Sequence, residues 1–271
     1  MTDDAPPRLR AADRSLRALA DSVANARPRV AADFADPDIP VAATVILARD
    51  GVDGLEVLLI ERPDRGSFAG AWVFPGGKLD PADAGEPGDA SAPEEADARR
   101  AAVREVWEET GLRIEAKGLV PLSCWDPPPG LALRIRTWFF IARAPEGELR
   151  LEPREAVAGE WMRPGDALRR HGKGELTLYP PTWVTLFGLA DATDVDGLLG
   201  ATRVAGTQTF ETQVRRGAGG PVFYWREDAE YDGDAQHAGG AGDDGNGDAA
   251  ASGPRHRLDV GALPWVYTRS G

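Results

Sequence analysis

The chain is poor in cysteine and has no long apolar run. Its 271 residues include one cysteine, Cys124, so no disulfide can form within the chain and a reducing compartment is expected. No apolar stretch approaches the roughly 20 residues that a membrane-spanning helix needs. The first residues lack the charged and then apolar layout of a secretory signal. The sequence therefore predicts a cytoplasmic protein without a membrane partner.

Positive charge is also scarce. The chain has 31 Lys and Arg against 44 Asp and Glu, which gives a formal net charge of -13. A nucleic-acid groove needs a basic surface, so we expect no nucleic-acid partner. The apolar fraction of 42% and the charged fraction of 28% are those of an ordinary globular domain. Arginines, glycine-turn amides and a bound metal can still bind the phosphates of a small molecule.

One segment, from Ala92 to Leu112, has the pattern of an amphipathic helix followed by a stop. Ser91 and Glu94 are spaced as a capping box, and Gly111 suits the left-handed turn that ends a helix. The apolar residues that recur at helical spacing and are expected to face a core are Ala98, Ala102, Val103 and Val106.

Three carboxylates lie on another sector of this predicted helix. Glu105, Glu108 and Glu109 are one, three and four positions apart, which gathers their side chains. A divalent cation among them would relieve their repulsion, and carboxylate oxygens suit Mg²⁺ or Mn²⁺. The alternative is a solvated helix face with surface ion pairs to Arg100 and Arg104.

From Arg104 onward the sequence resembles the second half of the nudix box, the signature of hydrolases that cut a nucleoside diphosphate linked to another moiety. The signature is G-x5-E-x7-R-E-U-x-E-E-x-G-U, where U is a bulky apolar residue. Upstream, the stretch from Trp72 to Gly77 resembles the strand and glycine turn that open the box. The positions matched from the arginine onward are Arg104, Glu105, Val106, Glu108, Glu109, Gly111 and Leu112.

This resemblance implies an α/β (α+β) architecture, the nudix fold, with a mixed β-sheet between helices and the box as a loop-helix-loop. It implies hydrolysis of a pyrophosphate linkage, with Glu105, Glu108 and Glu109 as catalytic residues that hold Mg²⁺ or Mn²⁺. Arg104 is expected to orient these glutamates through charge-assisted hydrogen bonds and not to contact the substrate.

The box departs from the signature in its spacing. Gly77 and Arg104 are 27 positions apart, 13 more than the 14 of the signature. The inserted stretch, residues 80–92, is rich in Pro, Gly, Asp and Ala and is expected to form a loop. The place of the first glutamate falls on Ala96, and the sequence leaves open what replaces it, if anything does. The candidates are Asp80, Asp83, Glu94 and Glu95.

The segment before the box resembles a pattern of nudix enzymes that cleave coenzyme A, L-L-T-x-R-[SA]-x3-R-x3-G-x3-F-P-G-G. Ile60 replaces the threonine, Pro63 replaces the small residue, and the segment is one residue short. The inserted box is more similar to the peroxisomal-type coenzyme A diphosphatases of animals and their bacterial relatives. The matching residues are Leu58, Leu59, Arg62, Gly70, Phe74, Pro75, Gly76 and Gly77.

The expected substrate is therefore coenzyme A or an acyl derivative, a nucleoside diphosphate derivative that would give 3′,5′-ADP and phosphopantetheine. Arg62, Arg65, Gly76 and Gly77 are the expected substrate-binding residues, although the two arginines would also suit an exposed turn. ADP-ribose or a dinucleotide such as NADH is the alternative substrate. A hypothesis of another class is a nudix-fold module that binds a nucleotide as a regulatory signal without hydrolysing it.

Further along the chain, three charged residues have open roles. Glu160, in a region where nudix proteins sometimes place a base or a metal ligand, is a hypothetical member of the site. Arg134 and Arg136 are expected either to face a substrate phosphate or to serve the structure.

Four segments are expected along the chain. Residues 1–40 would form a helix and a linker, and residues 41–231 the nudix domain. Residues 232–254, of low complexity, would form a disordered loop, and residues 255–271 a terminal strand segment. The first helix is expected to pack on the domain or on the partner subunit of a homodimer.

Overall fold

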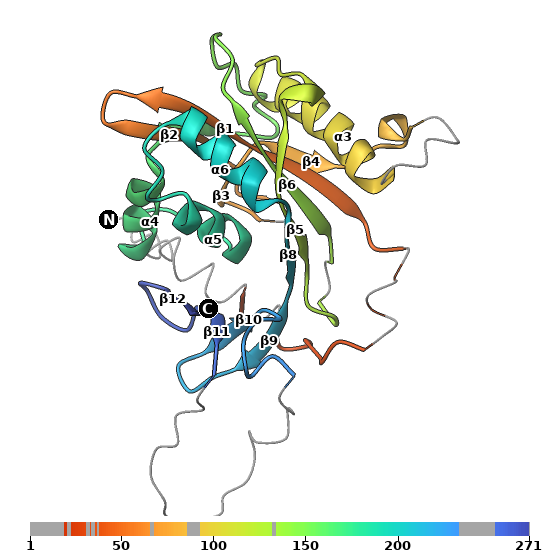
Figure 1. Ribbon diagram of the computed structural model, residues 1–271, viewed down its shortest axis with the longest axis vertical. Helices are drawn as coiled ribbons and strands as arrows, with labels where there is room; N and C mark the ends of the chain where they lie inside the picture. Colours follow the sequence, from red (N-terminus) through yellow and green to blue (C-terminus); the bar gives the residue numbers. More distant parts are fainter. Residues whose placement is uncertain are drawn as a thin grey trace, which may run out of the picture.

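In the computed structural model of this chain, residues 19–20, 23–30, 33, 36, 38–65, 68–85, 93–131, 134–232 and 253–270 are described. Within them a large mixed sheet has helix α3 on one face and helices α4, α5 and α6 on the other (Figure 1). A smaller antiparallel sheet lies at one end of the molecule (Figure 1). This arrangement confirms the predicted nudix fold, a mixed sheet between helices.

The large sheet has the order β3-β2-β1-β6-β5-β8, with β4 paired to β1 and β7 paired to β2. The pairs β1–β6 and β5–β8 are parallel, and the other pairs are antiparallel. The sequence predicts strands over residues 41–48 and 55–60 that pair as a hairpin across residues 50–54, and this hairpin is confirmed. The strands are β1 (Val41–Gly51), β2 (Gly54–Glu61), β3 (Trp72–Val73), β4 (Gly76–Lys78), β5 (Val120–Asp126), β6 (Arg136–Arg143), β7 (Ala158–Met162) and β8 (Gln208–Glu211).

Both faces of this sheet are covered, which explains why β1 is almost continuously apolar. Val45 and Leu47 pack with Ala102 of α3, whereas Ile46 lies on the opposite face with Leu186 of α5. The helices are α3 (Pro93–Thr110), α4 (Pro164–Gly172), α5 (Pro180–Gly188) and α6 (Val195–Ala205), with single 3-10 turns η1 (Pro81–Asp83) and η2 (Ala116–Gly118).

Helix α3 is the predicted box helix. Gly111 follows it at φ +69°, and its N–H donates to the carbonyl of Trp107 at 2.9 Å, so the predicted left-handed stop is confirmed. Ala98, Ala102 and Val106 are buried as expected. Ser91 of the expected capping box lies outside the described residues, and the helix begins at Pro93, a residue suited to a first turn.

The small sheet consists of β9 (Gln213–Arg216), β10 (Pro221–Tyr224), β11 (Arg255–Asp259) and β12 (Val266–Ser270), in the order β12-β11-β10-β9. The sequence also predicts that residues 255–267 form a pair of strands at the edge of a sheet. Only β12 is at the edge, because β11 also pairs with β10. The stretch 233–252, which was predicted to be a disordered loop, lies outside the described residues.

The segment before β1 differs from the expected linker. Arg29 donates to the Asp126 carboxylate at 2.7 Å and to the carbonyl of Pro127 at 2.9 Å, and Arg134 pairs with Asp36 at 3.1 Å. These bonds attach Arg29 to the end of β5 and Asp36 to the residue two positions before β6. The sequence missed this because the partners are about 100 residues apart. Much of the predicted N-terminal helix, including Leu9 and Leu16, lies outside the described residues.

Candidate active site

Three carboxylates from two parts of the chain converge beside the box helix. Glu105 and Glu109 are on α3, and Glu155 lies in the connection between β6 and β7. One oxygen from each side chain lies within 4.8 Å of the others. We refer to Glu105, Glu109 and Glu155 as the carboxylate cluster.

Glu109 is the most buried member, with 1% of its surface exposed. Its Oε2 accepts a hydrogen bond from the N–H of Gly76 at 2.7 Å, and its Oε1 lies 3.6 Å from Nη1 of Arg62. Burial raises the pKa of Glu109 to about 8, and the neighbouring Glu105 and Glu155 carboxylates also raise it, against the opposing effects of Gly76 and Arg62. Gly76 and Arg62 therefore offset only part of the cost of burying this carboxylate in its charged form.

Glu105 is packed against the glycine strand β4. A Cβ atom at Gly77 would lie 2.4 Å from the Glu105 carboxylate, so a side chain at this position would displace it. Gly76 has φ +153°, and a Cβ there would lie 2.2 Å from the carbonyl oxygen of Ala43. The two glycines were expected to form a turn, but they belong to a strand that pairs with β1 and lets α3 approach closely. Burial also raises the pKa of Glu105, although Arg104 opposes this.

Arg104 holds the box helix and the inserted segment together. It donates to Asp83 Oδ2 at 2.7 Å, to Glu105 Oε1 at 2.8 Å and to the carbonyl of Lys78 at 3.1 Å. The expected orienting contact of Arg104 with a box glutamate is thus present. Asp83 is 5% exposed, and its charge is balanced by this arginine.

The four candidates for the missing first box glutamate are placed differently. Asp83 contacts Arg104, whereas the Asp80 side chain accepts from the N–H of Ala82 and caps η1. Glu94 accepts from Trp138 and Arg136, and Glu95 pairs with Arg99; those partners lie outside the box motif. Of these four residues, Asp83 alone contacts the box arginine. It reaches this place because η1 folds the start of the insertion back onto α3.

Glu108, the third predicted metal ligand, lies outside the carboxylate cluster. Its Oε2 accepts from Arg104 Nη1 at 2.8 Å, and its side chain is 49% exposed. The structure therefore brings together two of the three predicted helix glutamates and replaces the third with Glu155.

Sequence reasoning placed the later acidic residue at Glu160, five positions too far. Glu160 pairs with Arg170 at 2.9 Å on the exposed side of β7. The connection carrying Glu155 is held against the end of α3, because the Glu152 N–H donates to the carbonyl of Glu109 at 3.1 Å. That packing depends on the register of β7 against β2, and no local pattern in the sequence signals it.

The expected substrate arginines have different surroundings. Arg62 is one-third exposed beside Glu109, whereas Arg65 donates to the carbonyl of Arg154 at 3.2 Å. Arg134 and Arg136, for which two roles were open, make ion pairs with Asp36 and Glu94 and serve the structure.

The donor set of the carboxylate cluster fits a hard divalent cation. It offers only carboxylate oxygens, two of its members have pKa values raised by burial, and no lysine or arginine is placed to neutralise all three. Oxygen ligands of this kind are those that Mg²⁺ and Mn²⁺ prefer.

Comparison with known proteins identifies the family. A model of the NUDIX domain matches residues 38–180, just over half of the 271-residue chain. The chain belongs to the NUDIX family. The match covers the large sheet as far as β7 together with α3, the glycine strand and all three members of the carboxylate cluster.

Two relatives illustrate the similarity. The chain is 30% identical over 131 residues to the CTP pyrophosphohydrolase of Escherichia coli strain K12. The aligned stretch covers 48% of this chain and 80% of that protein. The crystal structure of a NUDIX hydrolase from Alicyclobacillus acidocaldarius superposes with a TM-score of 0.53 at 26% identity, covering 60% of this chain and 96% of that one. The protein is accordingly a nudix hydrolase, of a class that cuts pyrophosphate linkages in nucleotide derivatives with the help of divalent metal ions.

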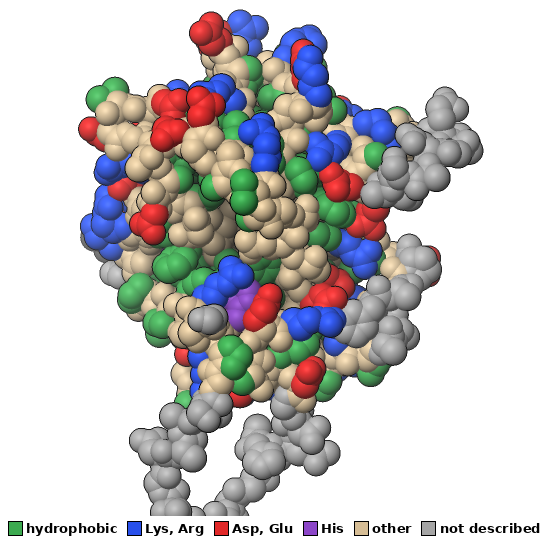
Figure 2. All heavy atoms as spheres, in the orientation of Figure 1, with side chains coloured by type: hydrophobic (Ala, Val, Ile, Leu, Met, Phe, Trp, Pro, Cys, Tyr) green, Lys and Arg blue, Asp and Glu red, His purple; other side chains and the backbone are tan. Residues whose placement is uncertain are grey.

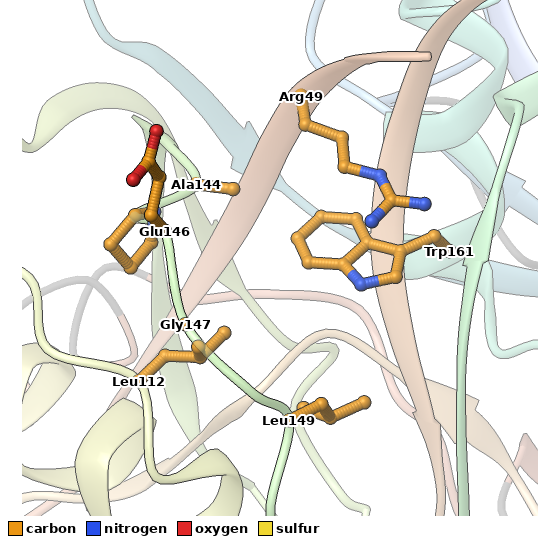
Figure 3. A pocket seen from close by; sticks show the side chains of 8 residues that line it. Arg49, Leu112, Ala144, Glu146, Gly147, Leu149 and Trp161 are labelled. Atoms are coloured by element: carbon orange, nitrogen blue, oxygen red, sulfur yellow. The ribbon is translucent and has the colours of Figure 1, made fainter. Parts of the chain in front are cut away.

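A separate pocket of about 340 Å³ lies beyond the end of α3 (Figure 3). Arg49 lies over the ring of Trp161 on one side, and Leu112, Ala144 and Gly147 form the other side (Figure 3). No member of the carboxylate cluster lines it. Arg49 is also paired with Glu56 at 2.7 Å, so its charge is already balanced.

On the face seen in Figure 2, acidic and basic side chains are interspersed. None of the helices in the described part of the nudix hydrolase is both long enough and apolar enough to cross a membrane.

Proposed function

We propose that this nudix hydrolase cleaves a pyrophosphate linkage with a divalent cation held by Glu105, Glu109 and Glu155. The observation that carries the proposal is the convergence of these three carboxylates within 4.8 Å. Mg²⁺ or Mn²⁺ is the proposed ion, because the donors are hard oxygen atoms. When bound, such an ion stabilises charge on phosphate oxygens and lowers the pKa of a bound water.

The surrounding residues prepare the cluster for this role. The N–H of Gly76 fixes the Glu109 carboxylate, and Arg104 fixes the Glu105 carboxylate while Asp83 holds Arg104 in turn. Glu108, which is also a box residue, is proposed to hold Arg104 in this geometry through their ion pair, while its side chain remains half exposed to solvent. Arg62 is proposed to meet a substrate phosphate, since its guanidinium is partly exposed next to Glu109.

For the substrate we infer coenzyme A or an acyl-coenzyme A, with 3′,5′-ADP and phosphopantetheine or its acyl form as products. Arg62 supports this choice, because it is the charged residue of the upstream pattern that reaches the cluster. Leu58, Leu59 and Phe74 of the same pattern are buried and are explained by packing alone.

A second candidate substrate is a nucleoside triphosphate such as CTP. The 30% identity to a CTP pyrophosphohydrolase, over 80% of that protein, favours it. Hydrolysis would then give the nucleoside monophosphate and pyrophosphate. ADP-ribose and NADH are retained as further members of the same chemical class.

Mass spectrometry of each candidate substrate after incubation with the purified protein tests the proposal. Reactions with Mg²⁺, with Mn²⁺ and with EDTA run in parallel, and Glu109→Gln serves as the matched variant. We expect metal-dependent cleavage of coenzyme A into 3′,5′-ADP and phosphopantetheine by the unaltered protein and not by the variant. Cleavage of CTP in preference to coenzyme A would replace the substrate while keeping the reaction.

Failure to cleave any of the four compounds, with tight binding of one of them, would favour the regulatory module instead. A cytoplasmic location, which fits the buried thiol of Cys124, and a homodimer are further proposals. Light scattering of the purified chain measures the oligomeric state.

A further inference from the structure

A bulky residue near the active site has an unfavourable backbone conformation. Phe68 has φ +61°, and it is the one non-glycine residue with positive φ among those described. For an aromatic residue this conformation is an outlier and is unfavourable. Glycine or asparagine would occupy the same position at lower cost.

Packing of the Phe68 ring does not account for this cost. The side chain is 40% exposed, so much of its apolar surface remains in contact with water. Its ring meets Tyr179 in a T-shaped pair, with centroids 4.8 Å apart and an angle of 90° between the planes. In a T-shaped pair the partner covers at most one face of a ring, so at least one face of Phe68 is not covered by Tyr179.

Phe68 belongs to the same turn as Arg62. The N–H of Gly70 donates to the carbonyl of Arg62 at 3.2 Å, and the N–H of Ala71 donates to the carbonyl of Phe68 at 3.0 Å. Phe68 and Gly70 are two positions apart, so their Cα atoms are separated by at most about 7 Å. The backbone at Phe68 is therefore held close to the backbone of Arg62, whose guanidinium lies 3.6 Å from Glu109.

The segment that carries Tyr179 is bonded to the start of β3. Ala71 and Thr177 form a parallel bridge, and the N–H of Trp72 donates to the carbonyl of Thr177 at 2.8 Å. Tyr179 follows two residues after Thr177, directly before α5. It is packed against the core between the large sheet and α5. The aromatic pair thus stands on two anchored segments.

We propose that Phe68 is a specificity-determining residue whose ring stacks on the planar base of the substrate. The inference rests on the proposed hydrolysis of a nucleotide derivative and adds the place where the base binds. The phosphates lie at Arg62 and the carboxylate cluster, and the base lies on Phe68 beside Tyr179. Stacking on a base is favourable and gives the exposed ring of Phe68 a partner that the protein alone does not supply.

Two substitutions of Phe68 separate a stacking role from a packing role. Phe68→Asn removes the ring but tolerates positive φ, and Phe68→Tyr keeps a ring of the same shape. For the nucleotide substrate that the unaltered protein cleaves, we expect Phe68→Asn to raise KM about tenfold with kcat within twofold. Phe68→Tyr should restore KM, and the melting temperature of Phe68→Asn should not fall.

Two controls restrict the effect to the base. The inhibition constant of inorganic pyrophosphate, which has no base, should be the same for the unaltered protein and for Phe68→Asn. Phe187, another exposed phenylalanine, lies on α5 and packs on Trp183. Phe187→Asn should leave KM unchanged.

An unchanged KM together with a lower melting temperature in Phe68→Asn would overturn the inference and make Phe68 a packing residue. An equal rise in the inhibition constant of pyrophosphate would also overturn it, because the loop as a whole would then have moved. If the unaltered protein cleaves no nucleotide, the proposed reaction fails separately. Calorimetric titration of AMP, CMP and coenzyme A into both proteins then decides, and equal affinities would reject stacking on Phe68.

Discussion

The two ends of the molecule treat buried carboxylates in opposite ways. At the small sheet, Arg257 contacts Asp228 and Glu230, and Arg255 contacts Glu230, so acidic and basic groups are matched. At the box helix the carboxylates outnumber the arginines that contact them. The ion pairs at the small sheet therefore stabilise the fold, whereas the carboxylates at the box helix have an excess of negative charge that a bound cation would offset.

The pKa values follow this contrast. Burial raises the pKa of Asp228, but hydrogen bonds from Arg257 and from backbone N–H groups outweigh it, so the pKa is lowered. Arg257 lowers the pKa of Glu230 as well. At the carboxylate cluster burial wins, and the pKa of Glu109 is raised to about 8. A buried carboxylate whose pKa stays raised although Arg62 lies 3.6 Å away, with two further carboxylates beside it, belongs to a site that suits a metal ion.

The largest expected effect comes from Glu109→Gln. We expect kcat in Mg²⁺ to fall about a thousandfold, since loss of a metal ligand removes several kcal/mol of charge stabilisation. In EDTA at neutral pH the urea midpoint of the variant should equal or exceed that of the unaltered protein, because the raised pKa of Glu109 means that its ionisation favours the unfolded chain, and Gln does not ionise. Kinetics and urea unfolding measure the two effects, and a parallel loss of stability would remove the contrast between the two ends.

Asp228→Asn should have the opposite profile. The carboxylate accepts from Arg257 and from the N–H groups of His256 and Glu230, and it is 4% exposed. Breaking a buried pair leaves a charge without its partner, so unfolding free energy should fall by about 3 kcal/mol. We expect kcat to stay within twofold. Glu148→Gln, in an exposed pair with Arg150, is the matched control and should change stability by less than about 0.5 kcal/mol.

His171 is a buried ionisable group of a third kind, because burial keeps its imidazole neutral at pH 7. Burial lowers the pKa of His171 to about 4, and its Nδ1 accepts from the N–H of Leu178 at 3.3 Å. Between pH 6.5 and about pH 4, His171 is protonated in the unfolded chain but neutral in the folded protein. The folded protein therefore has its full stability above about pH 6.5 and loses stability as the pH falls through this range. From pH 7 to pH 5 the loss should be about 2 kcal/mol.

Urea unfolding at both pH values, for the unaltered protein and for His171→Gln, measures this contribution. The variant should lose about 2 kcal/mol less than the unaltered protein over the same interval. Equal acid sensitivity of the two proteins would mean that His171 is not kept neutral by burial.

The smallest effect is expected for Glu108→Gln. This side chain is half exposed and contacts Arg104, outside the carboxylate cluster. We expect kcat to fall about tenfold, through a less firmly held Arg104, and stability to change by less than about 0.5 kcal/mol. Titration of Mn²⁺ should give an affinity close to that of the unaltered protein. A loss as large as that of Glu109→Gln would place Glu108 among the metal ligands.

Local patterns predicted much of the matched domain. The hairpin of β1 and β2, the helix α3 and its stop at Gly111 depend on neighbours in the sequence, and all three are present. The strands β8 and β9 were not predicted, because they are short and lack a clear alternation. They lie outside the stretch that matches the NUDIX domain.

The sequence by itself determined the reaction class and the placement of Glu105 and Glu109 on one side of a helix, since a spacing of four residues fixes that geometry. The tertiary structure decided the rest of the site. It brought Glu155 to the cluster, set Asp83 against Arg104 across the inserted segment, and paired β11 with β10. These contacts join residues distant in the chain, and their geometry depends on strand register and packing, which no short stretch of sequence specifies.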